Sequence, residues 1–411
     1  MHHTFRALAG RDFRLYFTGQ VVSLVGTWVQ QVAMSWITYR ITGSAFMLGL
    51  IAFSGQIPML VLSPLGGTLA DRLDRRKLLI VTQLLAMVVA TWLAVLAYTG
   101  GFSPWVLVAA SIVMGSSSAM EMPTRQAFIL DIVHDRSHAT NAIALNSLTF
   151  NAARLVGPAV AGVLLAALGE TVCFVTNAVS YLAALYTLLV IHPRVTGRHG
   201  RGGSVREGVD YVLQFAPARW LLITVAASSL SVAPFVTFMP VYAKDIFHGG
   251  PQTLGILMGA SGLGAVLAGL YLANRKSLAG AGERIVASSY VAAAASMAFA
   301  YNPLLGLALP LLVASGGATI IIVTSSNMLL QLLVPENLRG RVMALYTMSF
   351  IGMLPVGALA AGGLAHLVGV QPVFVLTGVT ALVMGYVLKR KIPDLSEKAR
   401  SALAEKERLS A

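Results

Sequence analysis

Long hydrophobic stretches alternate with short polar segments along most of the chain. A membrane-spanning helix requires about 20 apolar residues, and three of the stretches are long enough for two passes. These three break at Gly100-Gly101, at Asn302-Pro303 and between Gly369 and Pro372. The stretches without Asp, Glu, Lys or Arg are 15–39, 41–70, 78–120, 171–193, 220–243, 246–274, 285–335 and 342–388. A further span at 138–169 is interrupted only by Arg154, so the pattern predicts twelve transmembrane helices.

No stretch alternates hydrophobic and polar residues with a period of two, which disfavours a membrane β-barrel. In lipid, each helix satisfies its own backbone amides, so the predicted fold class is an all-α membrane protein. Composition supports this class. Hydrophobic residues make up 56% of the chain and charged residues 11%, whereas a soluble domain has about 25% charged residues. An ordinary soluble enzyme is therefore excluded.

Basic residues are strongly segregated between the two predicted membrane faces. Of the 29 Lys and Arg residues, 26 fall on the face that carries both termini, and the opposite face holds Arg40 and Lys244. Cytoplasmic loops carry the basic excess, so both termini are predicted to be cytoplasmic. The net charge of +13 is thereby explained by orientation and by contact with lipid headgroups. A nucleic-acid partner is not expected.

The longest polar gap, 194–219, divides the predicted spans into six and six. Ser204 and Glu207 form a capping-box pattern ahead of an apolar run, which predicts a short amphipathic helix on the cytoplasmic surface. A solvated linker is the alternative. The predicted parts are a bundle at 1–193, the linker at 194–219, a bundle at 220–391 and a charged cytoplasmic tail at 392–411.

The two halves are related in sequence. A shift of 200 residues aligns identical residues, among them Gly157 with Gly357, Gly162 with Gly362, Gly169 with Gly369, and Phe174 with Phe374. Because each half has an even number of spans, both halves have the same orientation. This parallel repeat resembles the arrangement of major facilitator transporters. The resemblance implies two pseudo-symmetric six-helix bundles around a cavity whose access alternates between the two membrane faces.

The loop between the second and third spans carries Gly67-Thr-Leu-Ala-Asp71-Arg72-Leu-Asp74-Arg75-Arg76-Lys77. It resembles the signature loop of the major facilitator superfamily and departs from it at Asp74, where the family usually has Gly. The resemblance implies a cytoplasmic gate in which Asp71 faces the start of helix eleven and Arg339 or Arg341. A stop-transfer charge cluster is the alternative. The predicted gate residues are Gly67, Asp71, Arg72, Arg75, Arg76 and Arg341.

The fifth span contains Gly157 and Pro158, followed by Gly162. This pattern resembles the antiporter motif of exporters in the superfamily. Small residues also allow close helix packing, and proline permits a bend, so packing alone is the alternative interpretation.

Glu121 and Arg154 are the most informative charged residues inside the predicted spans. Each lies about 24 Å by helical rise from the loop that joins their helices, so they reach the same depth. Arg125 follows Glu121 by one turn and is a second possible partner. The repeat-related positions are Ile321 and Leu354, so the fold itself does not require these charges. The pair is either a proton-responsive site, with Glu121 as the coupling group, or a structural ion pair.

Several polar residues could line a substrate cavity, or could simply bond across helices. They are Gln20, Trp28, Gln31, Ser326 and Asn327. The chain has no phosphate-binding G-x-x-x-x-G-K-[ST] loop, its histidines lack metal-ligand spacing, and it has a single cysteine. No cofactor or metal is therefore expected, and a proton gradient is the predicted driving force.

The first span and the segment after the fourth span resemble a bacterial subgroup of the superfamily that includes the enterobactin exporter and macrolide efflux proteins. The motifs that carry the resemblance include Phe13-Arg-Leu-Tyr16, Met122-Pro-Thr-Arg-Gln-Ala-Phe128 and Asn141-Ala-Ile-Ala-Leu-Asn-Ser147. The resemblance implies a proton-coupled exporter of siderophores or hydrophobic drugs in the bacterial inner membrane, and a monomer that carries an amphiphilic small molecule is expected. A nutrient importer driven by proton symport, and a membrane sensor or scaffold without transport, are the rival hypotheses.

Overall fold

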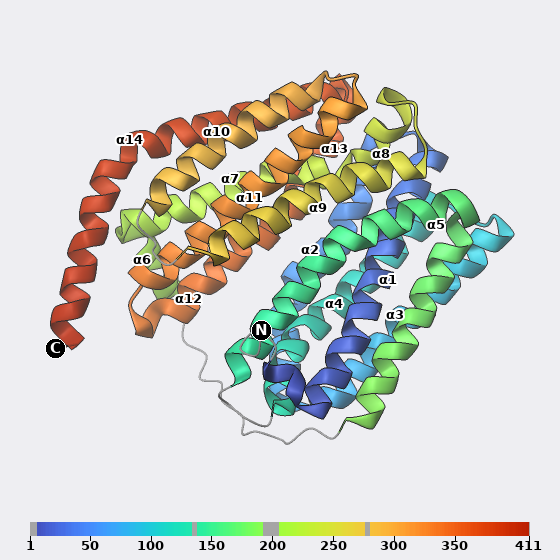
Figure 1. Cartoon of the computed structure of the whole chain (residues 1–411), viewed down its shortest axis with the longest axis horizontal. Helices are drawn as coiled ribbons and strands as arrows, with labels where there is room; N and C mark the ends of the chain where they lie inside the picture. The colour runs from blue at the N-terminus through green and yellow to red at the C-terminus, as the bar shows by residue number, and fades with distance from the viewer. Residues whose placement is uncertain (1–5, 134–137, 192–204, 276–279, 411) are drawn as a thin grey trace. The chain divides into compact units, whose positions relative to one another are not determined.

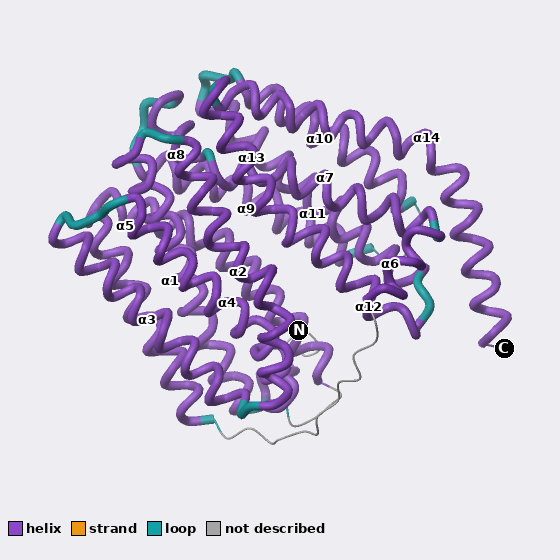
Figure 2. Tube along the Cα trace, turned by 180° about the vertical axis from the view of Figure 1, so that it is seen from behind, coloured by secondary structure: helices purple, strands orange, loops and turns teal. Residues whose placement is uncertain are grey.

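The structure is a computed structural model that describes residues 6–133, 138–191, 205–275 and 280–410. These residues form helices joined by short loops, and no strand occurs among them (Figures 1 and 2). Nine of the described helices are long and apolar enough to cross a membrane. The chain is thus an all-helical, multi-pass membrane protein. The first part of the predicted linker, 194–204, lies outside the described residues.

The chain divides into two compact units. Unit 1 comprises Met1–Gly200 together with Met239–Gly259, and unit 2 comprises Arg201–Phe238 together with Ala260–Ala411. The helices of unit 1 are η1 (Arg6–Ala9), α1 (Arg11–Thr42), α2 (Ala45–Arg72), α3 (Arg75–Thr99), α4 (Pro104–Ile132), α5 (Ala139–Val190), α8 (Met239–Val241) and the π-helix η3 (Tyr242–Ile246). Within this unit, α1 packs along α5 and α2 packs along α4.

Side-chain caps begin several of these helices. Ser44 accepts a hydrogen bond from the backbone amide of Met47 at the start of α2, and Ser103 accepts one from Val106 at the start of α4. Such caps satisfy backbone donors that a helix leaves unpaired. The predicted break after the third span is confirmed, because α3 ends at Thr99 and is capped by Gly100 with a φ of 72°.

Unit 2 contains the remaining helices and the second part of α9 (Pro251–Ala273). They are α6 (Val205–Gln214), α7 (Ala216–Thr237), α10 (Ala281–Ala300), α11 (Leu305–Leu333), α12 (Glu336–Thr347), the π-helix η4 (Met348–Gly352), α13 (Met353–Val368) and α14 (Val370–Ser410). Here α10 packs along α14 and α11, and α7 packs along α13. The helix α6 occupies the position of the predicted amphipathic helix.

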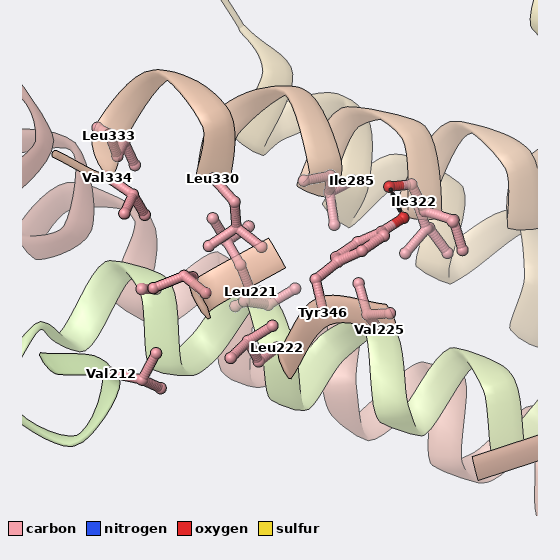
Figure 3. Close-up of a cluster of buried hydrophobic side chains, with 14 of the residues drawn as sticks. Val212, Leu221, Leu222, Val225, Ile285, Ile322, Leu330, Leu333, Val334 and Tyr346 are labelled. Atoms are coloured by element: carbon pink, nitrogen blue, oxygen red, sulfur yellow. Dashed lines mark hydrogen bonds between the residues drawn. The ribbon is translucent and has the colours of Figure 1, made fainter. Parts of the chain in front are cut away.

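A buried apolar cluster holds one end of unit 2 together (Figure 3). Leu221 and Val225 of α7 meet Leu330 of α11 and Tyr346 of α12 in this cluster. The Tyr346 hydroxyl donates a hydrogen bond of 3.0 Å to the backbone carbonyl of Val323. A buried tyrosine normally finds such a partner for its polar end, and here it ties α12 to α11.

Two glycines related by the 200-residue repeat share an unusual backbone conformation. Gly169 has φ 79° and ψ −178° at a break inside α5, and Gly369 has φ 85° and ψ 168° between α13 and α14. Residues with a Cβ rarely adopt this region, whereas glycine enters it without steric cost. The sequence repeat therefore extends to the backbone, and both predicted helix boundaries are confirmed.

A close helix contact at a glycine also occurs in both units. A Cβ on Gly115 of α4 would lie 2.8 Å from the backbone carbon of Gly55 of α2, and a Cβ on Gly316 of α11 would lie 3.0 Å from that of Ser261 of α9. In each unit, a glycine thus allows two helix backbones to approach closely. The two halves are built on one packing scheme.

Candidate transport site

The centre of unit 1 contains a buried carboxylate with two polar partners. Glu121 on α4 is 8% exposed and forms an ion pair with Arg125, one helical turn further along the same helix. The side-chain amide of Gln83 on α3 donates a hydrogen bond of 2.8 Å to the same carboxylate oxygen. A charge at this depth is costly unless it is paired in this way.

The sequence offered Arg154 and Arg125 as partners of Glu121, and the structure selects Arg125. Among the described side chains, Arg154 of α5 makes no ion pair, so the structure does not pair it with Glu121, and its part in proton coupling stays a prediction. Counting residues from the loop matches two side chains in depth but not in direction around the helix axis. Residues four apart on one helix, in contrast, lie on the same face and meet directly.

A tyrosine adjoins the Glu121 ion pair. Tyr16 of α1 is 2% exposed and lies within electrostatic range of both Glu121 and Arg125. Its ring packs against Phe128 with a centroid separation of 5.6 Å. The Tyr16 hydroxyl finds no hydrogen-bond partner among the described residues. A buried polar atom in this condition is exceptional, and it makes the region around Glu121 a polar site rather than an inert core.

A second buried polar cluster joins α1 to α5. The amide nitrogen of Asn177 donates a hydrogen bond of 2.8 Å to the side-chain oxygen of Gln30, and both residues are fully buried. Ser180 donates to the Asn177 side chain at 3.1 Å. Sequence reasoning did not select Asn177 or Gln83 as site residues. The available signal was the presence of amide side chains inside apolar spans. Their partners could not be predicted, because the paired residues are far apart in the chain.

The signature-like loop is tied to its own unit by arginines. Arg75 forms two hydrogen bonds of 2.9 Å to the carboxylate of Asp131 on α4, and its guanidinium lies 3.9 Å from Asp71. Arg76 donates to the backbone carbonyls of Leu188 and Leu189 at the end of α5. The loop therefore binds α2, α3, α4 and α5 together, and Asp131 anchors Arg75.

Asp74 explains why the loop tolerates its departure from the family pattern. Its carboxylate accepts a hydrogen bond of 3.1 Å from the backbone amide of Lys77 and so caps α3. Its backbone φ of −66° is ordinary, so no glycine is required. Arg72 is exposed, and a Cβ on Gly67 would meet no described atom within 4 Å.

The observed partners of the proposed gate residues lie within their own units, and the expected contact of Asp71 with Arg339 or Arg341 stays a prediction. The ion pair of Asp71 is with Arg75. Arg341 of α12 pairs with Glu207 of α6, and Arg339 lies 3.4 Å from Glu336. The contact of α6 with α12 is close, because a Cβ on Gly208 would lie 2.8 Å from the Cβ of Arg341. Arg341 thus docks the amphipathic helix within unit 2.

The antiporter-like motif in α5 occupies packing positions. A Cβ on Gly157 would lie 3.1 Å from the indole of Trp28, and one on Gly162 would lie 3.0 Å from the Cα of Gly255. Pro158 is buried between them. The motif therefore presses α5 against α1 and against the start of α9, which is a packing role. An exchange function of the motif stays a prediction.

The residues predicted to line a cavity have different surroundings. Gln20 is buried, Gln31 is exposed, and Trp28 packs edge-on against Phe150 with a centroid separation of 6.5 Å. In unit 2, the buried Ser326 hydroxyl has no hydrogen-bond partner among the described residues. Asn327 accepts a hydrogen bond of 2.6 Å from Gln331. As a set, they stay candidate cavity residues.

The two basic residues expected on the opposite membrane face lie in one charged cluster of unit 1. Arg40 forms an ion pair of 3.2 Å with Glu170. Next to Arg40, the Tyr39 hydroxyl donates a hydrogen bond to Asp245, and the Lys244 ammonium lies 5.5 Å from the centre of the Tyr39 ring. The cluster holds the segment after α7 on the end of α1.

Among the described residues, no group of three His, Cys, Asp or Glu side chains could hold a metal ion. The chemistry of the unit 1 site is thus that of a buried carboxylate, an arginine and amides. A family model described as transmembrane secretion effector, within the major facilitator superfamily, matches residues 2–409. The chain belongs to this family. Its members are membrane transporters and not enzymes.

Curated relatives of this transporter carry small molecules across membranes. The staphyloferrin A transporter of Staphylococcus aureus is 26% identical over 95% of this chain and 100% of its own length. The multidrug efflux pump Tap of Mycolicibacterium fortuitum is 25% identical, with 88% and 91% covered. Macrolide efflux protein A of Streptococcus pyogenes is 22% identical over 63% of this chain and 65% of its own length.

Solved structures share the fold of the transporter. The nucleoside transporter NupG superposes with a TM-score of 0.76 at 14% identity, over 93% of this chain and 99% of its own. A bacterial homologue of the lysosomal transporter Spinster, in an inward-facing conformation, gives a TM-score of 0.73 at 15% identity, with 94% and 98% covered. At these identities, the likeness shows the major facilitator fold alone.

Unit 2 of the transporter has a polar interior of another kind. A small cavity of about 20 Å³ lies among α7, α10, α11 and α14 and is lined by hydroxyl groups, including those of Ser231, Ser296, Thr319 and Thr377. The hydroxyls of Ser296 and Thr377 are 2.7 Å apart. The cavity has room for about one water molecule, and the described residues that line it carry no ionisable side chain.

Proposed function

We propose that this transporter exports an amphiphilic small molecule, such as a siderophore or a drug, in exchange for protons. In this proposal, twelve transmembrane helices form two six-helix bundles in the bacterial inner membrane, with both termini in the cytoplasm. The protein acts as a monomer without a cofactor, and the proton gradient drives alternating access to a cavity between the bundles.

The observation that carries the proposal is the buried carboxylate of Glu121. Arg125 and Gln83 both bind it, so its negative charge is stabilised by contacts that a proton would weaken. Neutralising Glu121 would release Arg125 and rearrange the polar residues of α3 and α4. A proton bound on one side of the membrane would in this way change the free energy difference between two conformations. Coupling requires such a differential contact.

The substrate class rests on the named functions of relatives and on the chemistry of candidate cavity residues. Relatives of similar length transport a siderophore or act as multidrug pumps. The candidate residues combine the indole of Trp28 with the amides of Gln20 and Gln31. Ligands of this kind present an apolar body and a few polar groups, which is the combination that small-molecule sites match.

The gate belongs to the same proposal. Asp71, Arg72, Arg75 and Arg76 would close the cytoplasmic side, with Asp131 fixing Arg75 in position. Opening would break a contact of the weakly held Asp71 rather than the two bonds between Arg75 and Asp131. The exposed Asp71 is therefore the expected moving part, and Asp131 the static one.

Everted membrane vesicles test the direction and the coupling. Acidifying the vesicle lumen should drive accumulation of a transported siderophore or drug if the protein is an antiporter. A symporter would not accumulate substrate under this gradient. A sensor or scaffold would show no transport with either gradient and no thermal stabilisation by any member of a panel of siderophores and antibiotics.

The Glu121→Gln variant tests the coupling group. It should lose proton-driven accumulation while it still binds substrate in a thermal-shift assay, after normalisation to folded protein. Glu170→Gln is the matched control, because Glu170 lies in unit 1 but belongs to the outer charged cluster, and it should retain proton-driven transport. Unchanged coupling in Glu121→Gln would assign the ion pair to structure.

A further inference from the structure

An apolar groove of about 290 Å³ lies on unit 2, between α9, α10 and α11. Small side chains form its floor, among them Gly264, Ala314 and Gly317. Larger apolar side chains form its rim, where Leu267 is 51% exposed and Val291 is 47% exposed. The groove is thus a concave apolar surface and is separate from the Glu121 site.

The floor of the groove is set by close contact of two helix backbones. A Cβ on Gly264 of α9 would lie 2.9 Å from the backbone nitrogen of Gly317, and one on Gly317 of α11 would lie 3.2 Å from the carbonyl oxygen of Gly264. Because both positions lack a side chain, the surface above them is hollow. The small side chains of Ala314 and Ala318 also line the groove and extend it beyond the two glycines.

A positively charged side chain, that of Arg275, lies at one end of the groove. Tyr271, which lines the groove near the end of α9, accepts a hydrogen bond of 2.7 Å from the guanidinium of Arg275. The guanidinium also stacks over the Tyr271 ring, 4.9 Å from its centre. Arg275 is exposed, and within the described part of the chain it makes no ion pair. Its orientation is therefore fixed while its charge stays uncompensated.

We propose that this groove binds an anionic phospholipid, with an acyl chain in the groove and the headgroup phosphate on Arg275. The charge decides the occupant. A guanidinium binds phosphate oxygens bidentately, and a basic residue at a helix end lies at the depth of the headgroups. An uncharged occupant would fill the apolar part but leave the Arg275 charge without an anionic partner. The inference is independent of the transported substrate and of proton coupling.

The pair formed by Tyr386 and Arg390 on α14 provides a matched control. Its guanidinium lies 4.7 Å from the ring centre, a distance similar to that of Arg275 from Tyr271, and neither residue lines the groove. Removing Arg390 therefore deletes a similar surface charge without touching the proposed site.

Native mass spectrometry of the purified full-length protein, with phosphatidylglycerol or phosphatidylcholine added, tests the proposal. The unmodified protein should retain phosphatidylglycerol preferentially. Arg275→Ala should weaken this binding at least about tenfold, as expected for the loss of a charge-assisted hydrogen bond to the phosphate, whereas Arg390→Ala should leave it nearly unchanged. Ala314→Phe fills the groove and should reduce binding of both lipids with Arg275 still in place.

The Val291→Asp variant changes an exposed rim position and gives a second route if the filled groove disturbs folding. It should also expel the acyl chain, and its melting temperature reports whether the fold is intact. Equal losses in Arg275→Ala and Arg390→Ala would reduce the effect to general surface charge and overturn the proposal. Equal retention of the two lipids would overturn it as well. A protein dimer that disappears in Ala314→Phe would identify a second copy as the occupant instead.

Discussion

Unit 1 and unit 2 follow one packing scheme but have different polar interiors. In unit 1, Glu121 pairs with Arg125, and Asn177 bonds to Gln30. The positions 200 residues later are Ile321, Ser325 and Thr377, so apolar and hydroxyl side chains stand where unit 1 has charges and an amide. The hydroxyls of Ser296 and Thr377 bond to one another in unit 2.

What the two units share is glycine. Gly169 and Gly369 make matching breaks, and Gly115 and Gly316 make matching helix contacts. The fold therefore depends on backbone freedom and close approach at these positions, because both units retain them. The buried charges are absent from the second set of positions, so the fold can form without them. The glycines are therefore features that the fold requires, whereas the buried charges are features of unit 1 alone.

The strongest test places the residues of unit 2 into unit 1. Glu121→Ile leaves Arg125 buried without its partner and should lower the free energy of unfolding by about 3–5 kcal/mol. The double variant Glu121→Ile/Arg125→Ser should recover most of that loss, because it removes both charges. Thermal unfolding in detergent measures the difference. A double variant as unstable as the single one would show that the fold of unit 1 requires the charges.

Because both units contain a close helix contact at a glycine, we expect the matching substitutions to lower the free energy of unfolding equally in the two units. Gly115→Ala and Gly316→Ala each place a methyl group against the backbone of a neighbouring helix, and each should cost about 2–3 kcal/mol. Gly363→Ala is the control, because a Cβ there would meet nothing within 4 Å and alanine favours a helix. A loss in only one half, measured by melting temperature, would break the correspondence.

The two helix breaks should respond alike, and less strongly. At Gly169 and Gly369 a Cβ would meet no atom within 4 Å, so substitution by alanine costs backbone energy alone. We expect about 1–2 kcal/mol at each position, measured by thermal unfolding of the two single variants. If Gly169→Ala lowers the melting temperature and Gly369→Ala does not, the backbone at Gly369 can adopt another conformation without cost.

The smallest effect concerns the hydroxyl pair of unit 2. Thr377→Val keeps the shape of the side chain and removes its hydroxyl, while Ser296 can still donate to the carbonyl of Phe374 at 2.8 Å. The expected loss is about 1 kcal/mol. A melting temperature as low as that of Glu121→Ile would contradict the view that the buried polar contacts of unit 2 contribute less to stability than the ion pair of unit 1.

Sequence alone predicted the features that depend on local pattern. The all-helical class follows from span length, and the breaks at Gly100 and Gly369 follow from glycine and proline between apolar runs. In each case the interacting groups are close in sequence, so their geometry is nearly fixed once a helix begins or ends.

Side-chain pairing across helices was harder to predict. Arg154 matched Glu121 in depth, yet the structure pairs Glu121 with Arg125, because depth leaves the direction around the helix undetermined. Asp131 is 56 residues from Arg75, and Asn177 is 147 from Gln30. Such contacts depend on how helices rotate against one another, and hydrophobicity constrains this rotation weakly in membrane spans that are apolar on every side.

The order of the two units along the chain has a practical consequence. Because Met239–Gly259 belongs to unit 1, the polypeptide passes between the units after Gly200, after Phe238 and after Gly259. A gene fragment that stops at the central linker would lack the segment bound to Tyr39, and the complementary fragment would carry that segment without its binding surface. Separately expressed halves should therefore misassemble, whereas co-expressed halves can restore the missing contact.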